Sequence, residues 1–381
     1  MRKILSLMIA LIILLCAIFS APIHALEDRE IIAQSAILMD KVTGRVLWEK
    51  NSQKKMAMAS TTKIMTCIVA LENAPLDLEI KVSHKAASAP KVKLYIKEGE
   101  TYLLGDLLYA LMLVSSNDVA VAIAEGVSGS VDAFCKLMTE KAVALGAKST
   151  SYKTPNGLDA KDHYTTAYDL ALITQYALDN EAFNKIINTK TYSFFDLKNA
   201  RSFTVNNKNT FLNMYEGANG VKTGFTGDAG YCFVGSVKQQ QMELIAVVLA
   251  CGWYPNKTFK WRDTIALMDY GFKNFKYLDL KINNQVVGGL SGLTYGKTDF
   301  VEGVMSCDFH MILQNEEQVR IIYEMKPITQ APIHEGQVIG YAHIYVDDNL
   351  YNTVNITSVQ SVERIDLKYC CKQVIESLLS F

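Results

Sequence analysis

Three short stretches, in one order along the 381-residue chain, decide the fold: Ser60-Thr61-Thr62-Lys63, Ser115-Ser116-Asn117 and Lys222-Thr223-Gly224. Each is weak evidence alone, because patterns this short recur by chance in chains of this length. Their ordinary explanations are a helix cap followed by an exposed lysine, a turn between two helices, and a turn-rich hairpin. The three together, each in a suitable setting, are far more specific.

The first stretch pairs a hydroxyl with an amine. Apolar residues recur at helical spacing after Ser60, which predicts a helix over residues 60–71. Residues i and i+3 of a helix lie one above the other, so Lys63 reaches Ser60. A serine hydroxyl is a poor nucleophile until a base removes its proton. Lys63 is such a base only if burial or a neighbouring cation keeps it neutral near pH 7, and Lys222 can supply that cation.

The second stretch belongs to four small polar residues, 115–118, that interrupt an otherwise apolar helical pattern over residues 104–125. This interruption predicts a loop between two helices that faces a cleft. There Ser115 can relay a proton to a leaving amine, and Asn117 can hydrogen-bond a substrate amide or Lys63.

The third stretch, within residues 220–224, stands shortly before a strand-like segment at residues 231–237. A glycine at a strand edge lets a peptide substrate approach the backbone closely, as an added antiparallel strand. Lys222 and Thr223 would then bind a carboxylate.

The surrounding elements predict a sheet covered by helices. Strands are expected at residues 35–40, 45–49, 231–237 and 242–250, with further helices at 131–145 and 166–178. Because the strands are joined as hairpins, the sheet should be antiparallel. After residue 275, short β-rich runs separated by Gly, Asn and Asp predict a small all-β domain.

With its context, the sequence resembles the low-molecular-mass penicillin-binding proteins that are serine D-Ala-D-Ala carboxypeptidases. The match is carried by residues 59–66, 115–125, 156–159 and 220–230, and it is close from residue 31 to 275. Asn206-Asn207-Lys208-Asn209 and the overall pattern look most like the sporulation-associated branch. The resemblance implies an α/β (α+β) penicillin-interactive serine transferase/β-lactamase-like fold. It also implies a catalytic domain at 26–275, a small β domain at 276–363 and an amphipathic helix at 364–381.

The implied activity removes the terminal D-alanine from peptidoglycan stem pentapeptides through an acyl-enzyme, and β-lactams such as penicillin inhibit it covalently. By motif, Ser60 is the nucleophile, Lys63 the base, Ser115 and Asn117 the second element, and Lys222, Thr223 and Gly224 the substrate strand. Ser116 replaces the glycine common in the middle of the second motif, which removes no functional group.

Two further roles follow from the resemblance. The backbone N–H groups of Ser60 and Phe225 would form the oxyanion hole. Arg262 stands in a stretch that resembles the one carrying the family's carboxylate-binding arginine, and a guanidinium suits a carboxylate. The alternative for Arg262 is a pair with Asp263 or a solvent-facing position at a helix start.

Other functions on the same fold are a β-lactamase, a non-catalytic cell-wall-binding module and an endopeptidase variant. The fast β-lactamases need a deacylating glutamate in a Glu-x-x-Leu-Asn segment between the second and third motifs, and no glutamate there has that context. A non-catalytic relative usually loses Ser60 or Lys63.

The two ends predict a protein that works outside the cytoplasm. Arg2 and Lys3 precede a largely apolar run and small residues up to Ala25, which predicts a signal peptide at 1–25 rather than an uncleaved anchor. Residues 364–381 form an amphipathic helix that either lies on the membrane surface or packs on the β domain. The mature enzyme is thus expected at the outer face of the cytoplasmic membrane, in the cell envelope.

Composition excludes several classes. With 38 basic and 39 acidic residues and half the residues hydrophobic, the chain is neither disordered nor a nucleic-acid binder that relies on positive charge. The cysteines after Cys16 are odd in number and sit in apolar patterns, which predicts buried free thiols more than a disulfide framework. No metal-ligand spacing is present, and no cofactor is expected.

Overall fold

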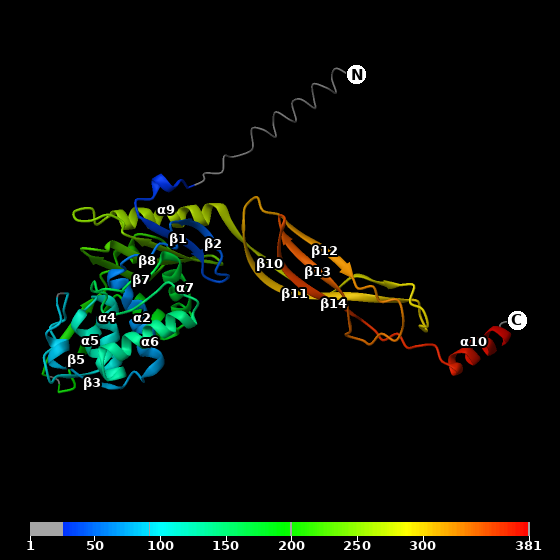
Figure 1. Cartoon of the computed structure of the whole chain (residues 1–381), viewed down its shortest axis with the longest axis horizontal. Helices are drawn as coiled ribbons and strands as arrows, with labels where there is room; N and C mark the ends of the chain where they lie inside the picture. Colours follow the sequence, from blue (N-terminus) through cyan, green and yellow to red (C-terminus); the bar gives the residue numbers. More distant parts are fainter. Residues whose placement is uncertain (1–25, 91, 199, 380–381) are drawn as a thin grey trace, which may run out of the picture. The chain divides into compact units, whose positions relative to one another are not determined.

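The computed structural model describes residues 26–90, 92–198 and 200–379, and the predicted signal peptide at 1–25 lies outside them. The chain divides after Asn274 into two compact units (Figure 1). No helix in the described part of the chain is long and apolar enough to cross a membrane.

The first unit is built on an antiparallel sheet of order β2-β1-β9-β8-β7, as the sequence predicts. The strands are β1 (Ser35–Asp40), β2 (Val46–Lys50), β7 (Ala218–Thr226), β8 (Gly230–Gln239) and β9 (Met242–Leu249). The third motif lies within β7, at one edge of this sheet. An edge strand presents unpaired backbone groups, so it can accept a further strand.

The helices that begin at the ends of the first two motifs pack together on one face of the sheet (Figure 1). The 3-10 turn η2 (Ala59–Thr62) leads into α2 (Lys63–Asn73), and the expected interruption separates α4 (Leu104–Leu113) from α5 (Asn117–Ser128). The remaining helices of this layer are α3 (His84–Ala87), α6 (Val131–Ala144), α7 (Ala167–Ala177) and α8 (Glu181–Asn188). Ser60 therefore lies on the 3-10 turn and not, as predicted, in the first turn of the α-helix, because α2 begins at Lys63.

Several elements of this unit were not expected from the sequence. They are α3 and α8, together with η1 (Asp28–Glu30), β3 (Glu79–Lys81), β4 (Thr101–Leu103), β5 (Thr191–Phe195), β6 (Ser202–Asn206) and η3 (Thr210–Asn213). Helix α9 (Phe259–Asn274) was considered only as a helix start in the alternative for Arg262. Helix α9 covers the face of the sheet opposite to α2, where the Thr264 side chain packs close to Gly235 of β8.

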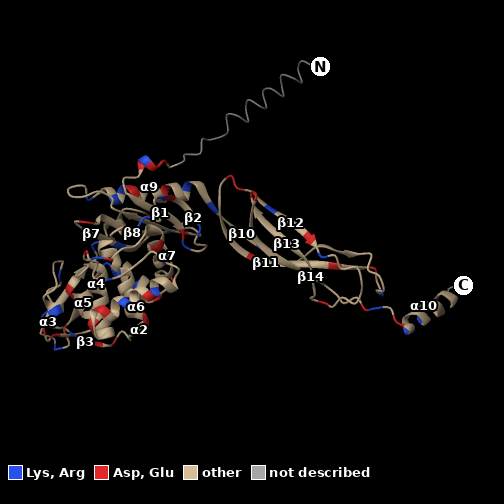
Figure 2. Cartoon of the chain, in the orientation of Figure 1, with Lys and Arg blue, Asp and Glu red and all other residues tan. Residues whose placement is uncertain are grey.

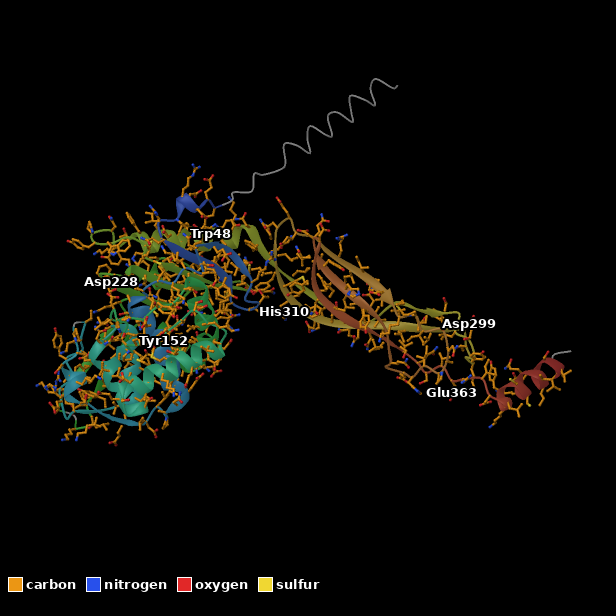
Figure 3. The ribbon with its side chains drawn as sticks, in the orientation of Figure 1. Trp48, Tyr152, Asp228, Asp299, His310 and Glu363 are labelled. Carbon is orange, nitrogen blue, oxygen red and sulfur yellow. The ribbon has the colours of Figure 1, made fainter. Side chains whose placement is uncertain are left out.

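The core of the first unit lies between its sheet and the helical layer. Tyr152, labelled in Figure 3 among the helices, is 2% exposed. Five of the cysteines (Cys67, Cys135, Cys232, Cys251 and Cys307) are buried free thiols, as predicted, whereas Cys370 and Cys371 are exposed.

The second unit is the predicted all-β domain followed by a helix. Its sheet has the order β10-β11-β14-β13-β12. The elements are β10 (Phe275–Ser291), β11 (Phe300–Gln314), β12 (Val319–Met325), β13 (Val338–Val346), β14 (Asn349–Ser358) and α10 (Leu367–Leu379). Strands β10 and β11 are much longer than expected, because Gly288 and Gly289 lie within β10 and do not end it.

Candidate active site

Ser60 and Lys63 meet at the start of α2. Lys63 is fully buried and its Nζ lies 3.0 Å from Ser60 Oγ. Two other oxygens surround the same nitrogen: Asn117 Oδ1 at 2.9 Å and the Asn156 carbonyl at 2.5 Å. The Asn117 amide is oriented by its other end, since Nδ2 donates to the Pro90 carbonyl.

Three oxygens that can accept hydrogen bonds thus surround the Lys63 nitrogen. The Asn117 and Asn156 oxygens can only accept, whereas the Ser60 hydroxyl can also donate. When the amine is neutral, its two N–H groups can serve the two carbonyl oxygens, which leaves its lone pair for the Ser60 hydroxyl. Burial, followed by the positive charge of Lys222, holds the pKa of Lys63 well below its ordinary value, and Asp118 opposes this shift.

The loop that supplies the Asn156 carbonyl can be built only with a glycine. Gly157 has a φ of +82°, and a Cβ added there would lie 2.0 Å from the carbonyl oxygen of Ala59. The loop is also joined to β7, because Thr226 Oγ1 donates to Asp159 at 2.8 Å. The close approach of Gly157 holds the Asn156 carbonyl against the turn that carries Ser60.

Strand β7 passes beside the same turn. A Cβ added at Gly224 would lie 3.0 Å from the backbone nitrogen of Ser60, so the strand and the turn are in direct contact. Phe225, whose backbone N–H is the second predicted oxyanion donor, follows Gly224 and has an exposed side chain. The backbones of both predicted donors thus run next to each other.

Lys222 is buried on β7, and its Nζ donates to the Thr223 carbonyl at 3.2 Å. Burial and the positive charge of Lys208 lower the pKa of Lys222 to about 7. Lys222 therefore changes its charge near neutral pH, and it is the neighbouring cation that was expected to act on Lys63.

Ser115 lies in the loop between α4 and α5, with a left-handed φ of +65°. Its hydroxyl is buried and has no hydrogen-bond partner within the described residues. Left-handed backbone is uncommon in a residue with a side chain and is frequent at functional loops. Within the described residues, the Ser115 hydroxyl is thus not used by another protein group.

Arg262 pairs with the carboxylate of Asp263. It lies in the first turns of α9, where its Nη2 is 3.0 Å from Asp263 Oδ1 and its side chain is 55% exposed. This is the pair expected under the alternative explanation. The buried cation of that turn is Lys260, whose Nζ lies 4.6 Å from the centre of the Tyr231 ring. Tyr231 in turn packs against Phe225.

Sequence reasoning missed several residues of the site. The Asn156 carbonyl belongs to a stretch that was noted only for its resemblance, and Asp118 and Lys208 were quoted within motifs without a role. Lys260, the buried cation of α9, was given no role. An acidic residue directly after Asn117, within an apolar helix, was the one available signal for Asp118.

The arrangement can carry out acyl transfer. It combines a hydroxyl next to a buried amine of lowered pKa, a second buried hydroxyl, backbone donors beside the nucleophile and a cationic strand edge. This combination of an antiparallel sheet, covering helices and a Ser60–Lys63 pair is the arrangement of a penicillin-interactive peptidase.

Comparisons with known proteins agree. Residues 22–252 match the family described as D-alanyl-D-alanine carboxypeptidase, and residues 275–364 match the penicillin-binding protein 5 C-terminal domain. The chain is 33% identical over 317 residues to the carboxypeptidase DacF of Bacillus subtilis, covering 81% of this chain and 80% of that protein. It is 29% identical over 367 residues to DacA of Escherichia coli K12, covering 89% and 88%.

Solved structures show the same likeness. The carboxypeptidase DacD of Francisella tularensis aligns with a TM-score of 0.71 at 27% identity, over 90% of this chain and 96% of that one. Penicillin-binding protein 5 of Haemophilus influenzae aligns equally well, over 89% and 100%. The chain belongs to the D-alanyl-D-alanine carboxypeptidase family of penicillin-binding proteins. Its similarity to DacF is consistent with the sporulation-associated branch.

Proposed function

We propose that the chain is a serine-type D-alanyl-D-alanine carboxypeptidase that acts through an acyl-enzyme on Ser60. The observation that carries this proposal is the Lys63 amine, which is fully buried beside two carbonyl-type acceptors and the Ser60 hydroxyl. A neutral amine in that position can take the hydroxyl proton as Ser60 attacks.

The reaction proceeds in two balanced halves. Ser60 Oγ bonds to the carbonyl carbon of the terminal D-Ala-D-Ala amide while its proton passes to Lys63. The carbonyl oxygen becomes an oxyanion next to the backbone N–H groups of Ser60 and Phe225. The amide C–N bond then breaks, and the D-alanine amine leaves with the proton that Lys63 passes on through Ser115. In the second half, water attacks the ester as Lys63 takes one of its protons. The ester C–O bond then breaks, Lys63 returns this proton to Ser60 Oγ, and the shortened peptide is released.

The terminal carboxylate of the substrate binds at β7. Lys222 and Thr223 supply one cation and one hydroxyl, and a second cation completes the pocket. Arg262 was the choice from the sequence, but its pair with Asp263 favours other cations for this role. Lys208 is supported because its charge acts on Lys222, and Lys260 because it lies under the Tyr231 ring.

The proposal is tested by mass spectrometry of a stem pentapeptide incubated with the purified mature chain. Loss of one D-alanine is expected, together with a covalent adduct of fluorescent penicillin on Ser60. Ser60→Ala should abolish labelling with nearly unchanged melting temperature. Ser306→Ala in the second unit, an exposed serine that bonds Asn284, is the matched control. An intact pentapeptide combined with rapid penicillin hydrolysis would instead favour a β-lactamase.

We further propose that the mature enzyme lies at the outer face of the cytoplasmic membrane, with α10 on the lipid surface. This is supported by the apolar side chains of α10, since Leu367, Leu378 and Leu379 are 71–81% exposed and no residue of the helix is buried. Apolar area on one helical face supplies affinity for a bilayer.

The membrane proposal predicts that a chain ending at Glu363 no longer binds liposomes but keeps its activity on a soluble peptide. Leu378→Glu should weaken liposome binding strongly. Gln373→Glu adds the same charge at a position outside the apolar set and should change binding little. Equal effects of the two substitutions, or no liposome binding by the full mature chain, would contradict the proposal.

A further inference from the structure

A backbone strap crosses the start of α5, next to the second motif. The backbone N–H of Asn117 donates to the Val92 carbonyl at 2.7 Å, and its side-chain Nδ2 donates to the Pro90 carbonyl at 3.2 Å. We use "strap" for residues 92–96. The strap therefore touches the same asparagine whose Oδ1 faces Lys63.

The Asp118 carboxylate binds the backbone of the strap. The carboxylate is fully buried and accepts from the backbone nitrogens of Leu94 at 3.0 Å, Tyr95 at 2.7 Å and Ile96 at 3.3 Å. Tyr95 has a left-handed φ of +63°, which lets consecutive N–H groups turn towards one carboxylate. A buried charge is costly unless it is fully hydrogen-bonded, and these donors satisfy it.

A second charged residue, Arg201, also binds the strap. Arg201, which precedes β6, donates to the Tyr95 carbonyl at 3.1 Å and forms an ion pair with Glu100. Asp118 and Arg201 thus fix the two polar groups of the Tyr95 backbone in opposite directions.

We propose that Asp118 is a positioning residue for the reaction of Ser60, which keeps the Asn117 amide directed at Lys63 by binding the backbone of residues 94–96. The inference rests on the acyl-enzyme function proposed above. Asp118 does not touch the nucleophile. Asp118 acts through Asn117, because both residues belong to the first turn of α5. The Asp118 side chain binds the strap, and the Asn117 side chain faces the Lys63 amine.

The charge of Asp118 gives this role a separate signature. Lys63 is faced by Ser60, Asn117 and Asn156, and the charged groups that act on it are Lys222 and Asp118. The carboxylate raises the pKa of Lys63, in opposition to burial and Lys222. Removal of that negative charge should lower this pKa further, so the neutral amine persists to lower pH.

The test is the rate of acylation by fluorescent penicillin, measured against pH for Asp118→Asn and Asp118→Glu. Asp118→Asn should acylate up to about 100-fold more slowly at its optimum, because the amide of Asn117 is no longer held in place. The acid limb of its pH–rate profile, where the rate falls because Lys63 becomes protonated, should move to lower pH. Asp118→Glu keeps the charge but is one methylene longer, so its rate should fall while its acid limb stays.

Asp169→Asn is the matched control. Asp169 is likewise a buried first-turn carboxylate that binds a loop, through the Ser149 N–H and the Thr150 hydroxyl. Its substitution should lower the melting temperature without slowing acylation of the folded enzyme or moving the acid limb. Arg201→Gln loosens the strap without touching Asp118, and it should slow acylation with the limb unchanged, even if Asp118→Asn does not fold.

The proposal is overturned if Asp118→Asn acylates at the wild-type rate with an unmoved acid limb. It is also overturned if Asp118→Asn and Asp169→Asn slow acylation equally and neither moves the limb. Failure of the proposed function is distinguishable, since the wild-type chain would then not be acylated at Ser60 in the first place.

Discussion

The two units of the chain differ in whether they bury charged side chains. In the first, many charged side chains are buried, among them Lys63, Asp118, Asp169, Lys222 and Asp263. In the second, Ser358 is the one buried polar residue among those described, and charged residues pair at the surface. Figure 2 shows that basic and acidic residues are nevertheless interspersed over both units.

This difference distinguishes the unit that contains the candidate active site from the unit that does not. Burying a charged side chain costs free energy unless hydrogen bonds and opposite charges satisfy it. A domain without a catalytic site is therefore expected to keep its charged side chains at the surface. Burial lowers the pKa values of three lysines in the first unit, Lys63, Lys222 and Lys260. Lys63 contacts the predicted nucleophile, and the charge of Lys222 acts on Lys63. Perturbed groups that converge in this way are typical of catalytic sites.

The comparison is tested most strongly at Lys63. Lys63→Arg should lower the acylation rate by about a thousandfold or more, because a guanidinium stays protonated and cannot act as a base. Lys281→Arg, in the exposed pair with Asp308 of the second unit, is the matched control and should leave acylation unchanged. Fluorescent penicillin labelling over time measures both. A Lys63→Arg enzyme that acylates within tenfold of wild type would remove Lys63 from the role of base.

A smaller effect is expected at the carboxylate pocket. Lys208→Ala should lower kcat/KM for a free-acid D-Ala-D-Ala peptide by roughly 1.5–3 kcal/mol, the range of a charged hydrogen bond. The amidated peptide should be affected far less. Lys260→Ala and Arg262→Ala are compared in the same assay, and Arg262→Ala should change little because its guanidinium pairs with Asp263.

A selective loss at Arg262 alone would restore the role predicted from the sequence. Equal losses on free-acid and amidated peptides, for any of the three variants, would assign that residue a structural role.

The pH dependence of the same pocket gives a graded effect. The pKa of Lys222 is lowered to about 7, so its positive charge is present below that pH and is lost above it. For the free enzyme, kcat/KM on a free-acid peptide should therefore fall above pH 7, approaching tenfold per pH unit. An amidated peptide lacks the carboxylate and should show no such fall. A matching alkaline limb on both peptides would mean that Lys222 does not bind the carboxylate.

The sequence predicted those parts of the site that are formed by side chains of characteristic type and spacing. Ser60, Lys63 and Asn117 follow from spacing and residue type, and the structure brings them together. The Asn156 carbonyl could not be predicted, because every residue has a carbonyl and only the close approach of Gly157 directs this one. Among several cations near the third motif, composition cannot decide which one lies beside Lys222.

The same limit applies to the fold. Two consecutive glycines, Gly288 and Gly289, predict a break between short β-rich runs, because glycine weakens a strand. Strand β10 nevertheless continues through them, with register shifts between Ile282 and Gln285 and between Val286 and Gly288. Such bulges allow a strand to continue through residues that weaken it, if a long neighbouring strand maintains the backbone hydrogen bonds on both sides of the bulge. Strand β11 is that neighbour here. The length of a partner strand is a property of the tertiary structure that local sequence does not contain.

The smallest effect is expected where the second unit carries its surface charges. Asp308→Asn removes the partner of Lys281, whose side chain is 63% exposed. Exposed pairs gain little, because water screens the two charges and ordering the side chains costs entropy. Thermal unfolding should therefore occur at the wild-type temperature at moderate salt, and acylation at the wild-type rate. A drop of several degrees would break the comparison, since it would show that the second unit also depends on a charge for its stability.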